Sequence, residues 1–332
     1  MKLRITHETS YSYAPAVETA QHMAYLQPLS TANQTLLDHA LRIEPLPEQV
    51  SRATDVFGNT RCFFSLQSPH TVLNVTASSV VSTSTSPMPE SEIGWEKTRE
   101  RFRYHSGDCF DSASEFVFGS PFVTRDAEFV AYAKPSFTPG SSVLAVATDL
   151  MQRIHRDFVY ESQSTEVNTP ALQALAQRKG VCQDFAHIMI ACMRSMGIPA
   201  RYISGYLLTQ PAPGTVKLKG SDASHAWVSV YIPDFPQGNR WCDLDPTNNR
   251  CGWHSPGEDY VTLATGRDFS DVSPMRGVIH GGASHILSVA VTVEPADDGG
   301  SIESQSSPVQ LQLQIQSQSN GQSQSQSQGL NA

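Results

Sequence analysis

The 332-residue sequence lacks the features that direct a chain to a membrane or to nucleic acid. No stretch approaches the roughly 20 apolar residues of a membrane-spanning helix, and the first residues contain no apolar segment of signal-peptide length. Basic residues form no run and the net charge is −9, which disfavours binding to a phosphate backbone. We therefore expect a soluble, cytoplasmic protein that binds neither membranes nor nucleic acids.

Cysteine is sparse as well. The chain has six cysteines, and no two of them are spaced as Cys-x-x-Cys. This low density argues against a disulfide framework, and the absence of paired cysteines argues against a structural zinc site. No segment resembles a calcium-binding loop. We expect reduced thiols, no metal and no cofactor, with most cysteines buried and one or two of them reactive.

The two ends of the chain differ in character from its middle. Residues 1–90 are typical of β-structure, because β-branched residues dominate 72–81 and a turn signal precedes an apolar run near residue 60. The polar, proline-bearing segment 82–92 predicts a linker. The Gln- and Ser-rich residues 297–332 predict a disordered tail, whose glutamines could also serve as amide substrates. Residues 91–296 then form the predicted core.

Helical periodicity followed by strand patterns indicates an α+β core. Apolar residues three and four apart predict a helix over 144–158, and Pro170 favours the start of a second helix that ends near Gly180. A third apolar stripe begins at residue 181 and stops at Gly197, so Cys182 lies in the first turn of this helix. Strand patterns follow at 200–208, 225–232 and 241–245.

Cys182 is the thiol best placed to react. A cysteine attacks as its thiolate, and the first turn of a helix favours that anion through unpaired backbone N–H groups and the positive end of the helix dipole. Cys192 lies about three turns further on, in the apolar stripe, and lacks this help. Cys242 alternates away from its acidic neighbours in a predicted strand and is expected in the core.

A reactive cysteine needs a base and a group that orients the base. If 225–232 and 241–245 form a hairpin centred at residue 236, His225 lies within two residues of facing Asp245. Strand alternation places Asp243 and Asp245 on the same face, so spacing alone does not choose between them as the orienting carboxylate. His187, five residues after Cys182 on the same helix, points elsewhere and is expected to be structural.

Several motifs agree in order, spacing and type with the bacterial transglutaminase-like superfamily of papain-like thiol enzymes, which the chain therefore resembles. They are GVCQDFAH at 180–187, GIPARY at 197–202, SGY at 204–206, DASHAW at 222–227, DPTN at 245–248 and GRDFSDV at 266–272. The β-rich first segment is similar to the N-terminal region that often precedes such cores. The resemblance implies a papain-like α+β core after a β-rich domain, with Cys182 as nucleophile, His225 as base and acid, and Asp245 as the orienting carboxylate.

Animal transglutaminases also use an upstream tryptophan as oxyanion donor, and this chain has no tryptophan between Trp95 and Trp227. The remaining donors would be the Cys182 backbone N–H and a second group, for which Gln183 and Tyr160 are candidates. The resemblance implies acyl transfer from a protein or peptide substrate through a thioester. A cysteine peptidase or amidase with the same triad, and a binding module without catalysis, are the alternatives.

Overall fold

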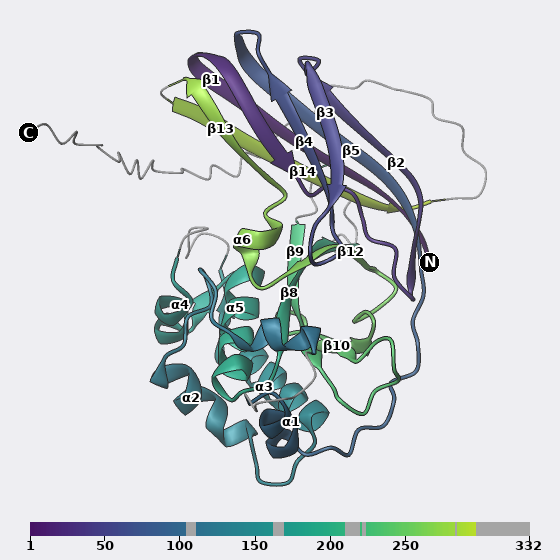
Figure 1. Ribbon diagram of the computed structural model, residues 1–332, viewed down its shortest axis with the longest axis vertical. Coiled ribbons are helices and arrows are strands. Elements are labelled where there is room, and N and C mark those ends of the chain that lie inside the picture. The colour runs from purple at the N-terminus through teal and green to yellow at the C-terminus, as the bar shows by residue number, and fades with distance from the viewer. Residues whose placement is uncertain (104–110, 162–168, 210–219, 221–223, 283, 297–332) are drawn as a thin grey trace, which may run out of the picture.

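The computed structural model describes residues 1–103, 111–161, 169–209, 220, 224–282 and 284–296. Cys109, the first two residues of the motif at 222–227, and the predicted tail lie outside these residues. Two antiparallel sheets lie next to each other, and the helices pack beside the second one (Figure 1). This is the predicted mixed architecture, with a strand-rich first part followed by an α+β core.

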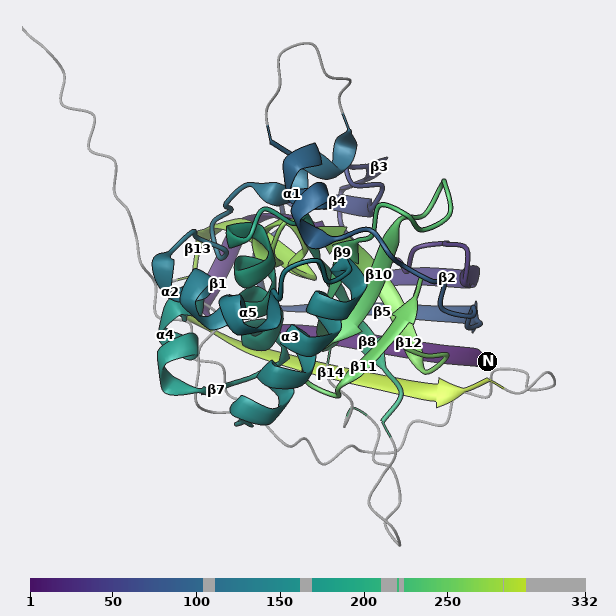
Figure 2. The same ribbon diagram turned by 90° about the horizontal axis from the view of Figure 1, so that it is seen from below.

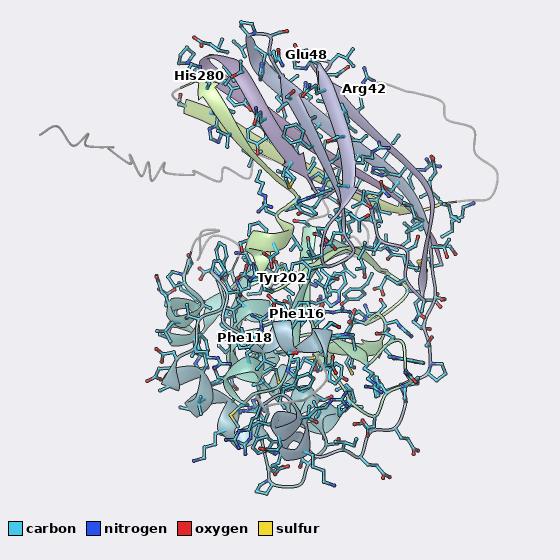
Figure 3. All side chains as sticks on the ribbon, viewed as in Figure 1. Arg42, Glu48, Phe116, Phe118, Tyr202 and His280 are labelled. Atoms are coloured by element: carbon cyan, nitrogen blue, oxygen red, sulfur yellow. The ribbon has the colours of Figure 1, made fainter. Side chains whose placement is uncertain are left out.

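The first sheet is built around the long strand β1, and its five N-terminal strands follow the order β2-β5-β1-β4-β3. These strands are β1 (Lys2–Ala24), β2 (Gln34–Glu44), β3 (Gln49–Thr54), β4 (Thr60–Leu66) and β5 (His70–Thr83). Of the predicted linker at 82–92, Ser82 and Thr83 still belong to β5, and residues 84–92 contain only an isolated bridge at Ser86. Arg42, Glu48 and His280 lie at the end of this sheet that is remote from the helices (Figure 3).

Two further strands of the first sheet come from the other end of the described chain. They are β13 (Met275–Gly281) and β14 (Ser284–Pro295). Both pair antiparallel with β1, which is 23 residues long and so has room for more than one neighbour on each side. The sequence patterns assign 275–295 to the core segment, whereas in the structure these residues complete the sheet that residues 2–83 begin.

The second sheet has the strand order β11-β10-β9-β8-β12. Its strands are β8 (Ala200–Leu207), β9 (Ser224–Tyr231), β10 (Trp241–Asp245), β11 (Arg250–Trp253) and β12 (Tyr260–Gly266). The three strands predicted between 200 and 245 are all present, within one residue of their predicted limits. A separate parallel pair, β6 (Val159–Tyr160) and β7 (Lys179–Gly180), lies beside the helices.

Helices gather on one side of the second sheet (Figure 2). They are α1 (Trp95–Arg101), α2 (Ala127–Ala133), α3 (Val143–Asp157), α4 (Ala171–Gln177), α5 (Cys182–Ser195) and α6 (Phe269–Val272), with short 3₁₀ turns at 112–117 and 134–136. The predicted α3 and α5 are confirmed. Helix α4 is shorter than predicted, because Arg178 adopts a left-handed conformation that stops it and the next two residues form β7.

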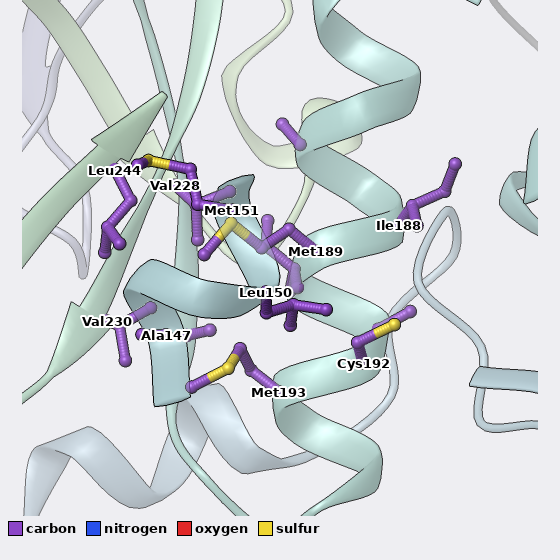
Figure 4. Packing of buried hydrophobic residues seen from close by; sticks show 14 of the residues in the cluster. Ala147, Leu150, Met151, Ile188, Met189, Cys192, Met193, Val228, Val230 and Leu244 are labelled. Carbon is purple, nitrogen blue, oxygen red and sulfur yellow. The ribbon is translucent and has the colours of Figure 1, made fainter. Parts of the chain in front are cut away.

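The core of this half lies between α3, α5 and the second sheet (Figure 4). Leu150 and Met151 from α3 meet Met189 and Met193 from α5, and Val228 of β9 packs against them. Helix α5 is buried on nearly its whole circumference, which its almost continuous apolar sequence requires. Cys182, its first residue, is therefore carried on a helix that is buried along most of its length.

A further apolar cluster joins the two sheets. Its buried members are Leu3, Ile5, Val81, Val291 and Val293 from the first sheet and Tyr206, Val261 and Leu263 from the second. The Tyr206 hydroxyl also bonds His7 Nδ1 at 2.9 Å inside this contact. The two sheets thus share a buried interface. None of the helices in the described part of the chain is long and apolar enough to cross a membrane.

Candidate active site

Cys182 is the first residue of α5, as predicted. Asp184 closes the start of the helix, because its Oδ2 accepts the backbone N–H of Val181 at 2.8 Å. The Asp184 side chain lies directly over Gly180, where a Cβ atom would come within 2.6 Å of Oδ2. Glycine at 180 and a carboxylate at 184 therefore fix the approach of the chain to the helix, and with it the position of the Cys182 sulfur.

The environment of Cys182 differs from that of the other thiols on and near α5. Cys182 is partly exposed, whereas Cys192 and Cys242 are fully buried. Burial raises the pKa of both buried thiols well above its usual range. Cys192 and Cys242 therefore stay protonated and pack as small apolar residues, which confirms the prediction that Cys242 belongs to the core.

The β9–β10 hairpin brings His225 and Asp245 together. Trp241 pairs with Tyr231 and Leu244 pairs with Val228, so the hairpin is centred at residue 236 as predicted. His225 and Asp245 are then diagonal neighbours on one face of the sheet. The His225 Nε2 atom lies 2.7 Å from Asp245 Oδ2, and the two side chains are only 9% and 0% exposed.

Asp245 is held by five donors. Its Oδ2 accepts Nε2 of His225, the Tyr260 hydroxyl and the Asn248 amide, each at 2.7 Å. Its Oδ1 accepts the backbone N–H groups of Thr247 and Asn248 at 2.8 and 3.3 Å. Burial by itself would raise the pKa of Asp245, but these hydrogen bonds and the charge of His225 lower it below its usual value. The carboxylate therefore stays ionised although it is inaccessible to water.

His225 connects this carboxylate to the thiol. Burial alone would lower the pKa of His225, but its hydrogen bonds with Asp245 and Cys182, together with their negative charges, raise it to about 10. Since Nε2 bonds Asp245, Nδ1 is the ring nitrogen that remains for Cys182. At neutral pH the ring is protonated. The arrangement therefore holds a positive charge between two groups that can be anionic.

Asp243, the alternative carboxylate, has different partners. Its Oδ2 accepts the Trp227 indole N–H at 3.0 Å, and the Arg201 guanidinium lies near it. Burial is the main influence and raises the pKa of Asp243, while burial also lowers the pKa of Arg201 to about 10. The bond to His225 is made by Asp245, so the structure distinguishes two residues that strand alternation treats as equivalent.

The two oxyanion candidates both lie near the start of α5. Gln183 is the second residue of the helix, and Tyr160 of β6 is paired with Gly180. The Tyr160 ring is 54% exposed and lies 6.3 Å from the ring of Phe185. Burial and the negative charges of Cys182 and Asp184 raise the pKa of Tyr160 to about 12, so its hydroxyl keeps its proton. The positions of both residues beside the start of α5 suit a donor.

His187 is a packing residue. Its Nε2 accepts the backbone N–H of Phe269 at 3.2 Å, and its ring lies between Phe122 and Tyr202. Burial lowers the pKa of His187 to about 4, which keeps it neutral. Among the described residues, no three His, Cys, Asp or Glu side chains come together in a way that could hold a metal ion.

The sequence patterns did not identify Tyr260 or assign a role to Asn248, and they predicted only packing near the site for Trp227. Asn248 lies inside a motif, and Trp227 is two residues from His225, so both were near recognised signals. Trp227 packs 6.0 Å from the His225 ring and 5.4 Å from the Tyr260 ring, which shields the His225–Asp245 bond from solvent. Tyr260 carries no local signal, because only the pairing of β12 with β8 brings it to Asp245.

A cysteine at the first turn of a buried helix, beside a histidine and an aspartate carried by an antiparallel sheet, defines the class of papain-like thiol enzymes. Residues 3–82 match the bacterial transglutaminase-like N-terminal region, and residues 130–246 match the transglutaminase-like superfamily. The chain belongs to this superfamily, as the sequence motifs predict.

Relatives and solved structures agree with this assignment. An uncharacterized protein of Mycobacterium tuberculosis is 36% identical over 302 residues, which cover 89% of this chain and 93% of that protein. The protein-glutamine gamma-glutamyltransferase of Pseudomonas aeruginosa is 32% identical over 107 residues, 31% of this chain and 15% of that protein. A crystal structure of a candidate cysteine protease from Cytophaga hutchinsonii has the same fold, with a TM-score of 0.67, 22% identity, and coverage of 91% and 92% of the two chains.

Proposed function

We propose that this protein is a transglutaminase-like acyltransferase that acts on carboxamide groups of proteins or peptides. The observation that carries the proposal is the 2.7 Å bond between the buried His225 and Asp245, together with the interaction with Cys182 that helps to raise the pKa of His225. A protonated histidine beside a helix-terminal thiol favours the thiolate, and the buried carboxylate keeps the ring oriented and charged. These are the requirements for nucleophilic attack by sulfur at neutral pH.

The proposed reaction has two steps. The Cys182 sulfur attacks the carbonyl carbon of a glutamine side chain, and the proton on His225 Nδ1 passes to the departing ammonia, which leaves a thioester. A primary amine then attacks the thioester and gives its proton to His225, so that a substituted amide forms and the Cys182 thiolate is regenerated beside the protonated histidine. The Cys182 backbone N–H would stabilise the oxyanion of each tetrahedral intermediate, with the Tyr160 hydroxyl or the Gln183 amide as second donor.

The activity of the Pseudomonas aeruginosa relative supports transfer over hydrolysis. In hydrolysis, water would replace the amine in the second step, and the product would be a carboxylate. The same three residues serve both reactions, because they act on the thioester and not on the choice of acceptor. The cysteine protease in the Cytophaga hutchinsonii structure shares the fold, which makes peptide or amide hydrolysis the second candidate function.

The test supplies a fluorescent primary amine and a glutamine-containing peptide to the full-length protein. Amine incorporation that Cys182→Ala and His225→Ala both abolish is the expected result. Release of ammonia or of a peptide fragment without incorporation would replace transfer by hydrolysis. If neither occurs and iodoacetamide labels Cys182 no faster than a free thiol, the chain is a binding module of the same fold and the catalytic proposal fails.

A further inference from the structure

Strand β12 lies at the edge of the second sheet and faces the first sheet. It pairs with β8 on one side only, which leaves the main-chain groups of its other side without a neighbouring strand. An open edge of this kind is a position where another segment can add hydrogen bonds. The residues that occupy it come from the N-terminal sheet region, which lies directly above β12 (Figure 1).

Gln34 takes the place of a neighbouring strand at Thr262. Its Oε1 accepts the Thr262 N–H at 2.8 Å and its Nε2 donates to the Thr262 carbonyl at 2.8 Å. The second amide hydrogen goes to the Leu29 carbonyl at 2.7 Å. Gln34 is 5% exposed, so this amide is buried and its donors are fully used. These two buried hydrogen bonds between the Gln34 amide and the Thr262 backbone fix the position of β12 relative to the first sheet.

Asn59 makes the same paired contact three residues further along β12. Its Oδ1 accepts the Thr265 N–H at 2.8 Å and its Nδ2 donates to the Thr265 carbonyl at 2.7 Å. Asp55 orients this amide through a bond from Nδ2 to its Oδ2 at 2.9 Å. Two side-chain amides from one sheet therefore replace a missing strand of the other.

Tyr260 lies two residues before Thr262 and connects this strand to the candidate triad. Its hydroxyl donates to Asp245 Oδ2 at 2.7 Å, and its side chain is 1% exposed. Burial and the charge of Asp245 raise the pKa of Tyr260, so the hydroxyl remains a donor. The Arg250 guanidinium lies 4.8 Å from the ring centroid, which limits movement of the ring.

We propose that Tyr260 is a positioning residue for Asp245 and His225, and that the N-terminal sheet sets its position through the Gln34–Thr262 contact. The inference rests on the proposed function, because the positioned groups are the proposed triad. It gives the N-terminal sheet a role in catalysis: the sheet completes the support of the carboxylate. The contacts that carry this support run from Leu29 and Gln34 through Thr262 and Tyr260 to Asp245.

The experiment compares Tyr260→Phe, Gln34→Leu and the double variant with the wild-type protein. Tyr206→Phe is the matched control, because Tyr206 is equally buried and bonds His7 in the contact between the sheets, away from Asp245. The first readout is the rate of Cys182 alkylation by iodoacetamide as a function of pH. The second is the titration of the His225 ring by NMR, which reports its bond to Asp245 whether or not the protein is an enzyme.

We expect Tyr260→Phe to slow alkylation at pH 7 about tenfold, as expected for the loss of one hydrogen bond to a buried charge. Gln34→Leu should slow alkylation roughly threefold. In the double variant it should add nothing to the effect of Tyr260→Phe, because Gln34 acts on Asp245 through Tyr260. In both variants the pKa of His225 should fall, since Asp245 is held less firmly. Tyr206→Phe should change neither readout.

Two results would overturn the inference. One is an unchanged His225 titration in Tyr260→Phe, and the other is a Gln34→Leu effect that persists at full size in the double variant. Failure of the proposed function looks different: wild-type Cys182 would react as slowly as a free thiol, and His225→Ala would not slow it further. The NMR titration still decides the positioning role in that case.

Discussion

Each residue type of the proposed triad has a buried counterpart in this half of the molecule, away from the candidate site. Cys182 and Cys192 lie on the same helix, and Asp245 and Asp243 lie on the same strand. His225 has a counterpart in His187. The two sets have the same chemistry, so the differences between them come from their surroundings alone.

The difference lies in the partners. Each member of the first set contacts another member, and the pKa shifts of His225 and Asp245 both favour their charged forms. The interior set is dispersed: Cys192 packs among apolar residues, and burial lowers the pKa of His187 to about 4. His225 and Asp245 keep their charges although they are buried, because each contacts the other. For Cys192 and His187 burial is the largest influence, and it favours their neutral forms.

The cysteine pair should show the largest contrast. Cys182→Ala removes the nucleophile, and we expect the rate of amine incorporation or amide hydrolysis to fall by at least about 10³-fold. Cys192→Ala should leave the rate within about twofold but lower the free energy of unfolding by roughly 1–2 kcal/mol through the cavity it creates. Kinetics and urea denaturation measure the two effects. Comparable activity losses in both variants would end the distinction between the thiols.

Asp245 and Asp243 should show the next largest difference in activity. Asp245→Asn should lower kcat/KM by roughly 10²–10⁴-fold, because an amide neither supports the protonated His225 nor accepts its N–H with the same charge. Asp243→Asn keeps an acceptor for the Trp227 indole, so we expect less than a tenfold loss. A larger loss for Asp243→Asn than for Asp245→Asn would show that the interior carboxylate orients the base.

The histidine pair predicts a smaller effect, on stability and at opposite ends of the pH scale. His187 has a pKa of about 4 in the folded chain, so folding loses up to about 3 kcal/mol as pH falls from 6.5 through 4. His225 has a pKa of about 10, so its contribution is complete below pH 6.5 and is lost as pH rises through 10. Urea midpoints across pH measure both trends.

Two variants separate these trends. His187→Gln should reduce only part of the fall in the urea midpoint at acid pH. Burial also lowers the pKa of His7 and His22 to about 4, so these residues contribute to the same fall. His225→Gln should remove part of the loss of stability at alkaline pH, where the raised pKa values of buried thiols such as Cys192 also contribute. It should also weaken the loss at acid pH, because His225 is the main group that lowers the pKa of Asp245. The assigned charge states would be contradicted if His225→Gln abolished the whole loss of stability at acid pH. They would also be contradicted if this variant left the loss of stability at alkaline pH unchanged.

Local patterns predicted the parts of the site that local geometry controls. Helical periodicity located Cys182 at the start of α5, and the loop length fixed the register that brings His225 near Asp245. The choice of Asp245 over Asp243 as the orienting carboxylate needed the resemblance to a family. Residues two apart on a strand lie on the same face, so alternation does not distinguish them. Tyr260 and the Gln34 contact escaped prediction, since both depend on pairing between segments that are distant in the sequence: β12 with β8 for Tyr260, and residues 228 apart for Gln34 and Thr262.

The first sheet was predicted only in part for the same reason. Residues 2–83 carry strong strand signals, but nothing local states that β13 and β14 return to pair with β1. The register between Leu3 and Pro295 is a property of the folded chain. The roles of Cys182, His225 and Asp245 stay predictions that the variants above address. The two oxyanion candidates and the limits of the domains stay predictions as well.

The sharing of β1 between the two ends of the chain has a consequence for biosynthesis. A ribosome delivers β1 first and β14 almost 300 residues later, so at synthesis rates of about 5–20 residues per second the strand waits many seconds for its last partner. During this interval its edge is open to other chains. Residues 95–272 form a contiguous insert that can fold meanwhile. We expect a nascent chain halted near residue 272 to need a chaperone more than one halted near residue 296.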